Sequence, residues 1–314
     1  MAKVRLRAFE IINSDINKTQ SDLGDKLRIS LSGSKEVNER RMLLNPEDPQ
    51  QEEDLISDFG KISRSPDPVF CTMLRVALGN SVQHVNNSLF SRQQFTIADL
   101  NSNIVDAEAI YKNHYYFAVN NNFLVTNLPG NLTITRLQTY LNWLLNELYE
   151  INPMVADEAM PELSQIRDIV VRDTVINPST DSQSVNKRSA IDLTKAALNS
   201  IIDALSDTKD ISTHELEQMI SAKLVIEFRK PKKDDDEKIK KAFGALLKPV
   251  ADLDNFEFTT RNNKKIIKGK KILRTKEVSI ETTDSGHLIE SQISQQMALL
   301  LRDLDNERKK TANS

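Results

Sequence analysis

Basic and apolar residues alternate at the start of the chain, where residues 3–7 read Lys-Val-Arg-Leu-Arg. A period of two is typical of a half-buried strand, so we expect a strand over residues 3–12. The best hairpin joins the apolar runs 114–119 and 123–126 through three asparagines, which tolerate the left-handed conformation of tight turns. Similar patterns predict further strands over 68–78, 166–176, 223–228, 255–260 and 271–282.

Helical spacing of leucines predicts an amphipathic helix over residues 133–150, with its apolar side chains on one face. Further helices are expected over 18–32, 188–206, 212–221, 234–248 and 290–309. Two prolines and an acidic run indicate that 45–58 is a solvated loop or a short helix. Segments 152–163 and 177–186 have the composition of linkers.

These elements do not alternate as regular βαβ units, so an α+β fold is the better prediction. We expect mixed, mainly antiparallel sheets with packed helices, arranged in two subdomains. The predicted division is an N-terminal α+β domain over 1–160 and a C-terminal basic α+β domain, with the closing helix, over 161–314.

Composition is that of a globular chain, with 39% hydrophobic and 28% charged residues among 314. The single cysteine, Cys71, lies in an apolar run, so we expect a small buried side chain, no internal disulfide and a reducing, cytoplasmic location. No apolar run reaches the roughly 18 residues of a membrane span, and the N-terminus lacks the apolar core of a signal peptide. We therefore expect no direct membrane insertion.

Sequence motifs for catalysis or cofactor binding are absent. The four histidines have no metal-binding spacing, and there is no Walker loop, Cys-x-x-Cys or Gly-x-Ser-x-Gly. The acidic run 234–237 is expected to cap a helix. Glu227-Phe-Arg has an arginine where an Asp…Glu-x-Lys nuclease needs a lysine. We therefore predict no catalytic residue, metal or cofactor and lean away from an enzyme.

Charge is unevenly distributed along the chain. Residues 223–276 contain 17 Lys+Arg and 8 Asp+Glu, a net charge of +9, so the other residues carry −12. Within this stretch, residues 261–276 include eight basic residues and no acid. Such a run suits a polyanion, because each cation placed near a phosphate releases condensed counterions. Lysines outnumber arginines six to two, and bidentate base recognition favours arginine, so sequence preference should be weak.

We expect phosphate contacts from Lys230, Lys232, Lys233, Arg261, Lys264, Lys265, Lys268, Lys270, Lys271 and Arg274. The alternatives for this charge are an acidic protein or membrane surface as the partner, or a solvated face with no partner. The closing helix has a long apolar face, which suits either self-association or packing on its own core. A homodimer would double the basic surface.

The C-terminal third also carries a resemblance to known proteins. It begins with Lys223-Leu-Val-Ile-Glu-Phe-Arg-Lys-Pro-Lys-Lys and continues with a lysine-rich helix, a strand at 278–280 and a closing helix with Met297. This succession resembles the RexA-like phage exclusion proteins and, more loosely, KwaB of the Kiwa anti-phage system; the hairpin at 116–126 and the helix after it also fit. The resemblance implies a dimeric, largely sequence-nonspecific DNA-binding protein in phage exclusion or anti-phage defence, with a membrane effector as a partner protein.

Two rival functions are compatible with the same sequence. One is a metal-dependent nuclease with an unrecognised carboxylate site. The other is a regulatory protein whose basic face binds an acidic protein partner.

Overall fold

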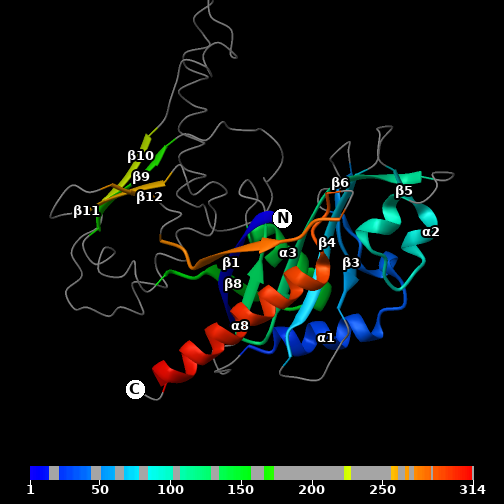
Figure 1. The fold of residues 1–314 in the computed structure, drawn as a ribbon, viewed down its shortest axis with the longest axis horizontal. Helices are drawn as coiled ribbons and strands as arrows, with labels where there is room; N and C mark the ends of the chain where they lie inside the picture. The colour runs from blue at the N-terminus through cyan, green and yellow to red at the C-terminus, as the bar shows by residue number, and fades with distance from the viewer. Residues whose placement is uncertain are drawn as a thin grey trace, which may run out of the picture. The chain divides into compact units, whose positions relative to one another are not determined.

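The computed structural model describes residues 1–13, 21–43, 51–60, 67–77, 84–101, 107–128, 134–156, 166–172, 223–227, 256–260, 266–268, 272–283 and 286–312. They belong to two compact units (Figure 1). The core unit comprises Met1–Met154 and Leu273–Ser314, and the inserted unit comprises Val155–Ile272.

The core unit is built on one curled antiparallel sheet. Its main path runs β13-β1-β7-β6-β4-β3-β2, with β5 paired to β6 and β8 paired to β1. The strands are β1 (Ala2–Asn13), β2 (Met42–Leu43), β3 (Glu53–Phe59), β4 (Val69–Ala77), β5 (His84–Asn86), β6 (Ala107–Val119), β7 (Phe123–Thr126), β8 (Tyr149–Pro153) and β13 (Thr275–Ile280). The strands predicted near 3–12 and 68–78 are confirmed.

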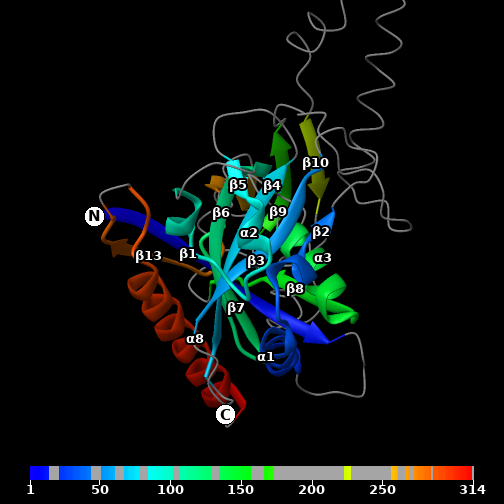
Figure 2. The same ribbon diagram turned by 90° about the vertical axis from the view of Figure 1, so that its right-hand side faces the viewer.

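Helices cover both faces of this sheet, because the strands are apolar on both sides. Along β6, Phe117 and Val119 pack in a cluster with residues of α1 (Leu23–Gly33) and α3 (Ile134–Leu145). The alternate residues Tyr116 and Ala118 pack with Met297 and other apolar residues of α8 (Glu290–Ala312). In Figure 2, α8 lies on one side of the sheet and α1 on the other.

A third apolar cluster lies at the β3–β4 end of the sheet. Its residues come from those strands, from the short helices η1 (Val37–Arg40), α2 (Asn87–Phe90) and η2 (Ile97–Asn101), and from Phe95 between α2 and η2. Phe90 and Phe95 meet there edge to face, with ring centroids 6.2 Å apart.

The predicted asparagine hairpin is confirmed as β6 and β7. The side-chain oxygen of Asn120 accepts hydrogen bonds from the backbone N–H groups of Asn122 (2.9 Å) and Phe123 (2.8 Å), which closes the turn. Helix α1 approaches this turn so closely that a Cβ on Gly24 would lie 2.8 Å from the backbone carbon of Asn120. Glycine is therefore required at the start of α1.

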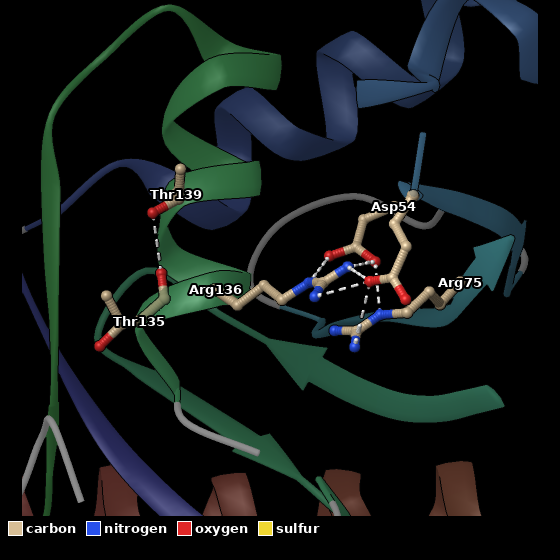
Figure 3. Close-up of polar contacts among 6 residues, drawn as sticks. Asp54, Arg75, Thr135, Arg136 and Thr139 are labelled. Atoms are coloured by element: carbon tan, nitrogen blue, oxygen red, sulfur yellow. Dashed lines mark hydrogen bonds and ion pairs between the residues drawn. The ribbon is translucent and has the colours of Figure 1, made fainter. Parts of the chain in front are cut away.

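The prediction of a loop or short helix is wrong over residues 53–58, because Glu53–Phe59 forms strand β3, while residues 45–50 lie outside the described residues. Its acidic residue Asp54 is 2% exposed and lies between two arginines (Figure 3). Arg75 Nε is 3.2 Å from Oδ1 of Asp54, and Arg136 of α3 places NH2 2.9 Å from the same oxygen. An acid that looked solvated in the sequence is therefore the centre of a buried ion-pair network, which Glu52 joins 3.5 Å from Arg136.

The helix predicted over 133–150 ends earlier than expected. Helix α3 stops at Leu145, and Asn146 has a positive φ of 50°, which ends the helical path. The chain then enters β8, where a linker was predicted from residue 152. Consequently Leu148 is 71% exposed instead of completing the apolar face of the helix.

The inserted unit contains a separate antiparallel sheet in the order β10-β9-β11-β12. Its strands are β9 (Ile166–Arg172), β10 (Lys223–Glu227), β11 (Phe256–Thr260) and β12 (Ile266–Lys268). The strands predicted near 166–176, 223–228 and 255–260 are confirmed. The linker predicted at 177–186 and the helices predicted over 188–206, 212–221 and 234–248 lie outside the described residues.

The chain leaves the core unit after Met154 and returns at Leu273. The two crossings are adjacent, since Arg274 N–H donates to the Met154 carbonyl (2.8 Å) and Ala156 N–H donates to the Ile272 carbonyl (2.7 Å). The predicted α+β class with mainly antiparallel sheets is confirmed. The predicted division at residue 160 placed the closing helix with the basic segment, whereas α8 packs on the sheet that begins with β1.

We predict that Asp54→Asn lowers the free energy of unfolding by about 3 kcal/mol, because it leaves two largely buried arginines without their carboxylate. Urea unfolding measures the loss. The matched substitution Glu150→Gln, at an exposed position of β8, should change stability by less than about 0.5 kcal/mol. Equal effects of the two substitutions would show that the network contributes nothing.

Candidate nucleic-acid interface

Most of the predicted phosphate contacts lie outside the described residues: Lys230, Lys232, Lys233, Arg261, Lys264, Lys265, Lys270 and Lys271. The backbone of Lys268 is described as the last residue of β12. Arg274 is described in full and belongs to the core unit.

Part of the basic run follows an antiparallel strand pair. In the pairing of β11 with β12, Glu257 is opposite Lys268 and Thr259 is opposite Ile266. The five residues that connect the two strands, 261–265, include three of the predicted contacts, so these cations belong to one hairpin connection. The strand predicted over 271–282 is found as β13, which pairs with β1 in the core unit, where Val278 and Ile280 pack beneath α8.

The last two cations of the basic run form ion pairs with α8. Arg274 NH2 lies 2.6 Å from Glu307 Oε1, and Lys276 Nζ lies 3.6 Å from Asp303 Oδ2. Arg274 is partly buried, with 26% of its side chain exposed. Both charges are therefore partly compensated inside the core unit, and the six earlier cations of the run lie in the inserted unit.

The apolar face of α8 packs on its own sheet. Ile293, Met297, Leu300 and Leu304 are all at most 3% exposed and share a cluster with strand residues such as Leu6. This face is therefore not available to a second copy of the chain. A homodimer stays a prediction, but the apolar face of the closing helix no longer supports it.

A row of three cations on β1, of which Lys3 and Arg5 are exposed, was missed as a site by sequence reasoning. Lys3, Arg5 and Arg7 lie on one face of β1. The alternation of basic and apolar residues that predicted the strand also indicates that these three cations share a face. Lys3 is exposed and Arg5 has 49% of its side chain exposed. The cross-strand partners on β13 are Ser279, Glu277 and Thr275.

A cluster of titratable side chains lies where α8 begins. Asp58, Thr72 and Tyr116 are cross-strand neighbours on β3, β4 and β6. Glu290 opens α8, and the hydroxyls of Thr72 and Tyr116 are near enough to influence the titration of its carboxyl group. Next to them, the ring of His114 lies 5.4 Å from that of Tyr116 and 5.7 Å from that of His287, measured between centroids.

Burial shifts the titration of this cluster. It raises the pKa of the Glu290 carboxyl, and the nearby Asp58 charge raises it further, while the two hydroxyls oppose the shift. Burial also raises the pKa of Asp58. Burial, with a smaller effect of His287, lowers the pKa of His114 to about 4. The surroundings therefore disfavour charge on acids and imidazole alike.

Perturbed acids and imidazoles are also found at catalytic sites. Among the described residues, no three or more His, Cys, Asp and Glu side chains are placed to bind one metal ion. Thr72 and Tyr116 are at most 1% exposed, which limits access to the deepest part of the cluster. Cys71 is fully buried, as predicted, and burial raises the pKa of its thiol.

Comparison of the chain with protein-family models and with curated proteins finds no match. Among the helices that the structure describes, none has both the length and the apolar character that crossing a membrane requires.

We predict that wild-type stability decreases as pH falls from about 6.5 towards 4, because the unfolded chain then binds a proton that folded His114 does not. His114→Gln should flatten this part of the curve. Thermal unfolding of both proteins between pH 8 and pH 4 gives the difference. Parallel curves would show that His114 titrates normally in the folded protein.

We predict that Glu290→Gln raises the free energy of unfolding at pH 7. A raised carboxyl pKa means that stability is lost as the pH rises through the folded-state value, and glutamine, which has a similar size and no charge, removes that loss. The gain should disappear below the ordinary pKa of 4.5. A variant that is less stable than wild type at pH 7 would contradict the assignment.

Proposed function

We propose that this chain binds the phosphate backbone of a nucleic acid, with DNA favoured, through the basic residues of 223–271 and with little sequence preference. The observation that carries the proposal is the local excess of positive charge. Of the 118 residues of the inserted unit, residues 155–222 have 6 Lys+Arg against 12 Asp+Glu, whereas residues 223–272 have 15 against 8.

The kind of cation supports backbone binding. Within 261–271 the basic residues are five lysines and one arginine. A lysine ammonium acts as a compact point charge towards phosphate, whereas base edges are recognised best by the planar fork of arginine. Asn262 and Asn263 add neutral donors for phosphate oxygens. Affinity should therefore depend on salt and only weakly on sequence.

The biological setting of the proposal comes from the resemblance to RexA-like phage exclusion proteins and, more loosely, to KwaB. It supports a homodimer that acts in phage exclusion or anti-phage defence beside a membrane effector. The distribution of charge supports only the affinity for phosphate, so the two parts of the proposal are tested separately.

We predict that binding to a labelled 30-base-pair duplex weakens steeply between 50 and 200 mM salt, by roughly a thousandfold if six phosphates are contacted. Lys264→Glu with Lys265→Glu should weaken binding and reduce the salt slope by about two. Fluorescence anisotropy on full-length protein measures both effects. A matched control, Lys35→Glu with Arg302→Glu, makes the same change in net charge at two exposed positions of the core unit.

Binding that ignores salt, or that falls equally in the control, would overturn the proposal. Cleavage of the duplex with Mg²⁺ or Mn²⁺ would favour the nuclease instead. A protein partner retained after nuclease treatment, with no duplex binding, would favour a regulatory role.

A further inference from the structure

We propose that the exposed face of β1 and β13 in the core unit is a second contact surface for the same nucleic acid, where it holds a stretch of phosphate backbone. This inference rests on the proposed function but uses different residues. We call this surface the β1 basic face, and it consists of Lys3, Arg5, Arg7, Thr275, Glu277 and Ser279.

Strand register fixes the layout of the β1 basic face. The antiparallel pairing sets Lys3 opposite Ser279 and Arg7 opposite Thr275, with Arg5 opposite Glu277 between them. Residues that are directly opposite project from the same face of a sheet. The surface therefore consists of three cross-strand pairs, each with one cation. The two outer pairs add a hydroxyl that can donate to a phosphate oxygen.

Packing within the core unit explains why α8 does not cover the face that carries Lys3 and Arg5. The even-numbered residues Val4 and Leu6 are buried beneath α8. On the opposite face, Phe9 and Ile11 are buried in the cluster that α1 and α3 complete. Along that face the side chains therefore change from basic at Lys3, Arg5 and Arg7 to apolar and buried at Phe9.

The dimensions suit an extended polyanion better than a single phosphate. Lys3 and Arg7 are four residues apart on a strand, which is about 13–14 Å at 3.3–3.4 Å per residue. That length corresponds to the axial rise of roughly four base pairs of a duplex, at about 3.4 Å each. The face has no aromatic side chain on which bases could stack, so it should contact backbone and not bases.

Glu277 gives the surface an internal competitor for the phosphate. Its carboxylate lies 2.9 Å from Arg5 NH2, and the hydrogen bond from Arg5 lowers the pKa of Glu277, which keeps it ionised at neutral pH. Phosphate that binds Arg5 must displace or share this partner. Removal of the Glu277 charge should therefore increase affinity, which a merely solvated basic face would not predict for one specific acid.

We predict that Lys3→Gln with Arg5→Gln weakens binding of the labelled duplex three- to tenfold at 100 mM salt, with a reduced salt slope, since up to two phosphate contacts are lost. Glu277→Gln should strengthen binding two- to fivefold. The matched control is Lys35→Gln with Arg302→Gln, which removes the same charge elsewhere. Anisotropy titrations use full-length protein and a single strand and a duplex of equal length, after thermal unfolding has shown that each variant folds.

The outcomes separate this inference from the proposed function. If wild type binds and substitution of Lys264 and Lys265 weakens binding, but Lys3→Gln with Arg5→Gln does not differ from the control, the β1 basic face is rejected and the proposed function stands. If wild type binds neither strand nor duplex, both fail. Weaker binding by both double variants, together with a gain for Glu277→Gln, supports both.

Discussion

The fold depends on the pairing of β1 with three other strands. Residues 2–7 of β1 pair with β13, residues 7–10 with β7 and residues 9–13 with β8. The core unit is therefore complete only when the chain returns from the inserted unit to add β13 and then α8. The entropic cost of a longer excursion grows slowly, by about 0.6 kcal/mol for each doubling of a flexible loop, so 118 residues can be accommodated between β8 and β13. The chain leaves the core unit after Met154 and re-enters it at Leu273, and these two points are adjacent, so the inserted residues begin and end at the same place.

Arginine and lysine have different roles in the core unit. The guanidinium of Arg40 is buried, and desolvation lowers its pKa; it donates to the carbonyls of Ile56 (3.1 Å) and Gln93 (2.6 Å) instead of pairing with a buried carboxylate. Arg75 and Arg136 share Asp54. The planar fork with several donors suits such fixed positions. These arginines bind groups inside the core unit. The cations that an external anion could reach are lysines and the basic residues at the exposed end of β1.

Local patterns in the sequence predicted the strands and the hairpin. The features that were not predicted mostly depend on residues that are far apart along the chain. The asparagine turn carries its own hydrogen bonds, so residues 114–126 could be assigned without tertiary information. Asp54 looked solvated because its partners lie 21 and 82 residues away. The leucine pattern continues through Leu148, and only the left-handed Asn146 ends the helix. For the candidate interface, the run of cations was evident in the sequence, but the pairing of Arg274 with Glu307, 33 residues later, was not.

Internal ion pairs also determine how much each cation gains from a phosphate. A solvated lysine such as Lys3 releases the counterions condensed on the nucleic acid when it binds, and this release makes affinity fall with salt. An arginine that already faces a carboxylate exchanges one partner for another, so its net gain is the difference between two similar contacts, less the desolvation of the displaced acid. Arg5, beside Glu277, and Arg274, beside Glu307, belong to this second kind. The salt-dependent part of binding should therefore come mainly from lysines. The paired arginines should orient the nucleic-acid strand and contribute less to its affinity.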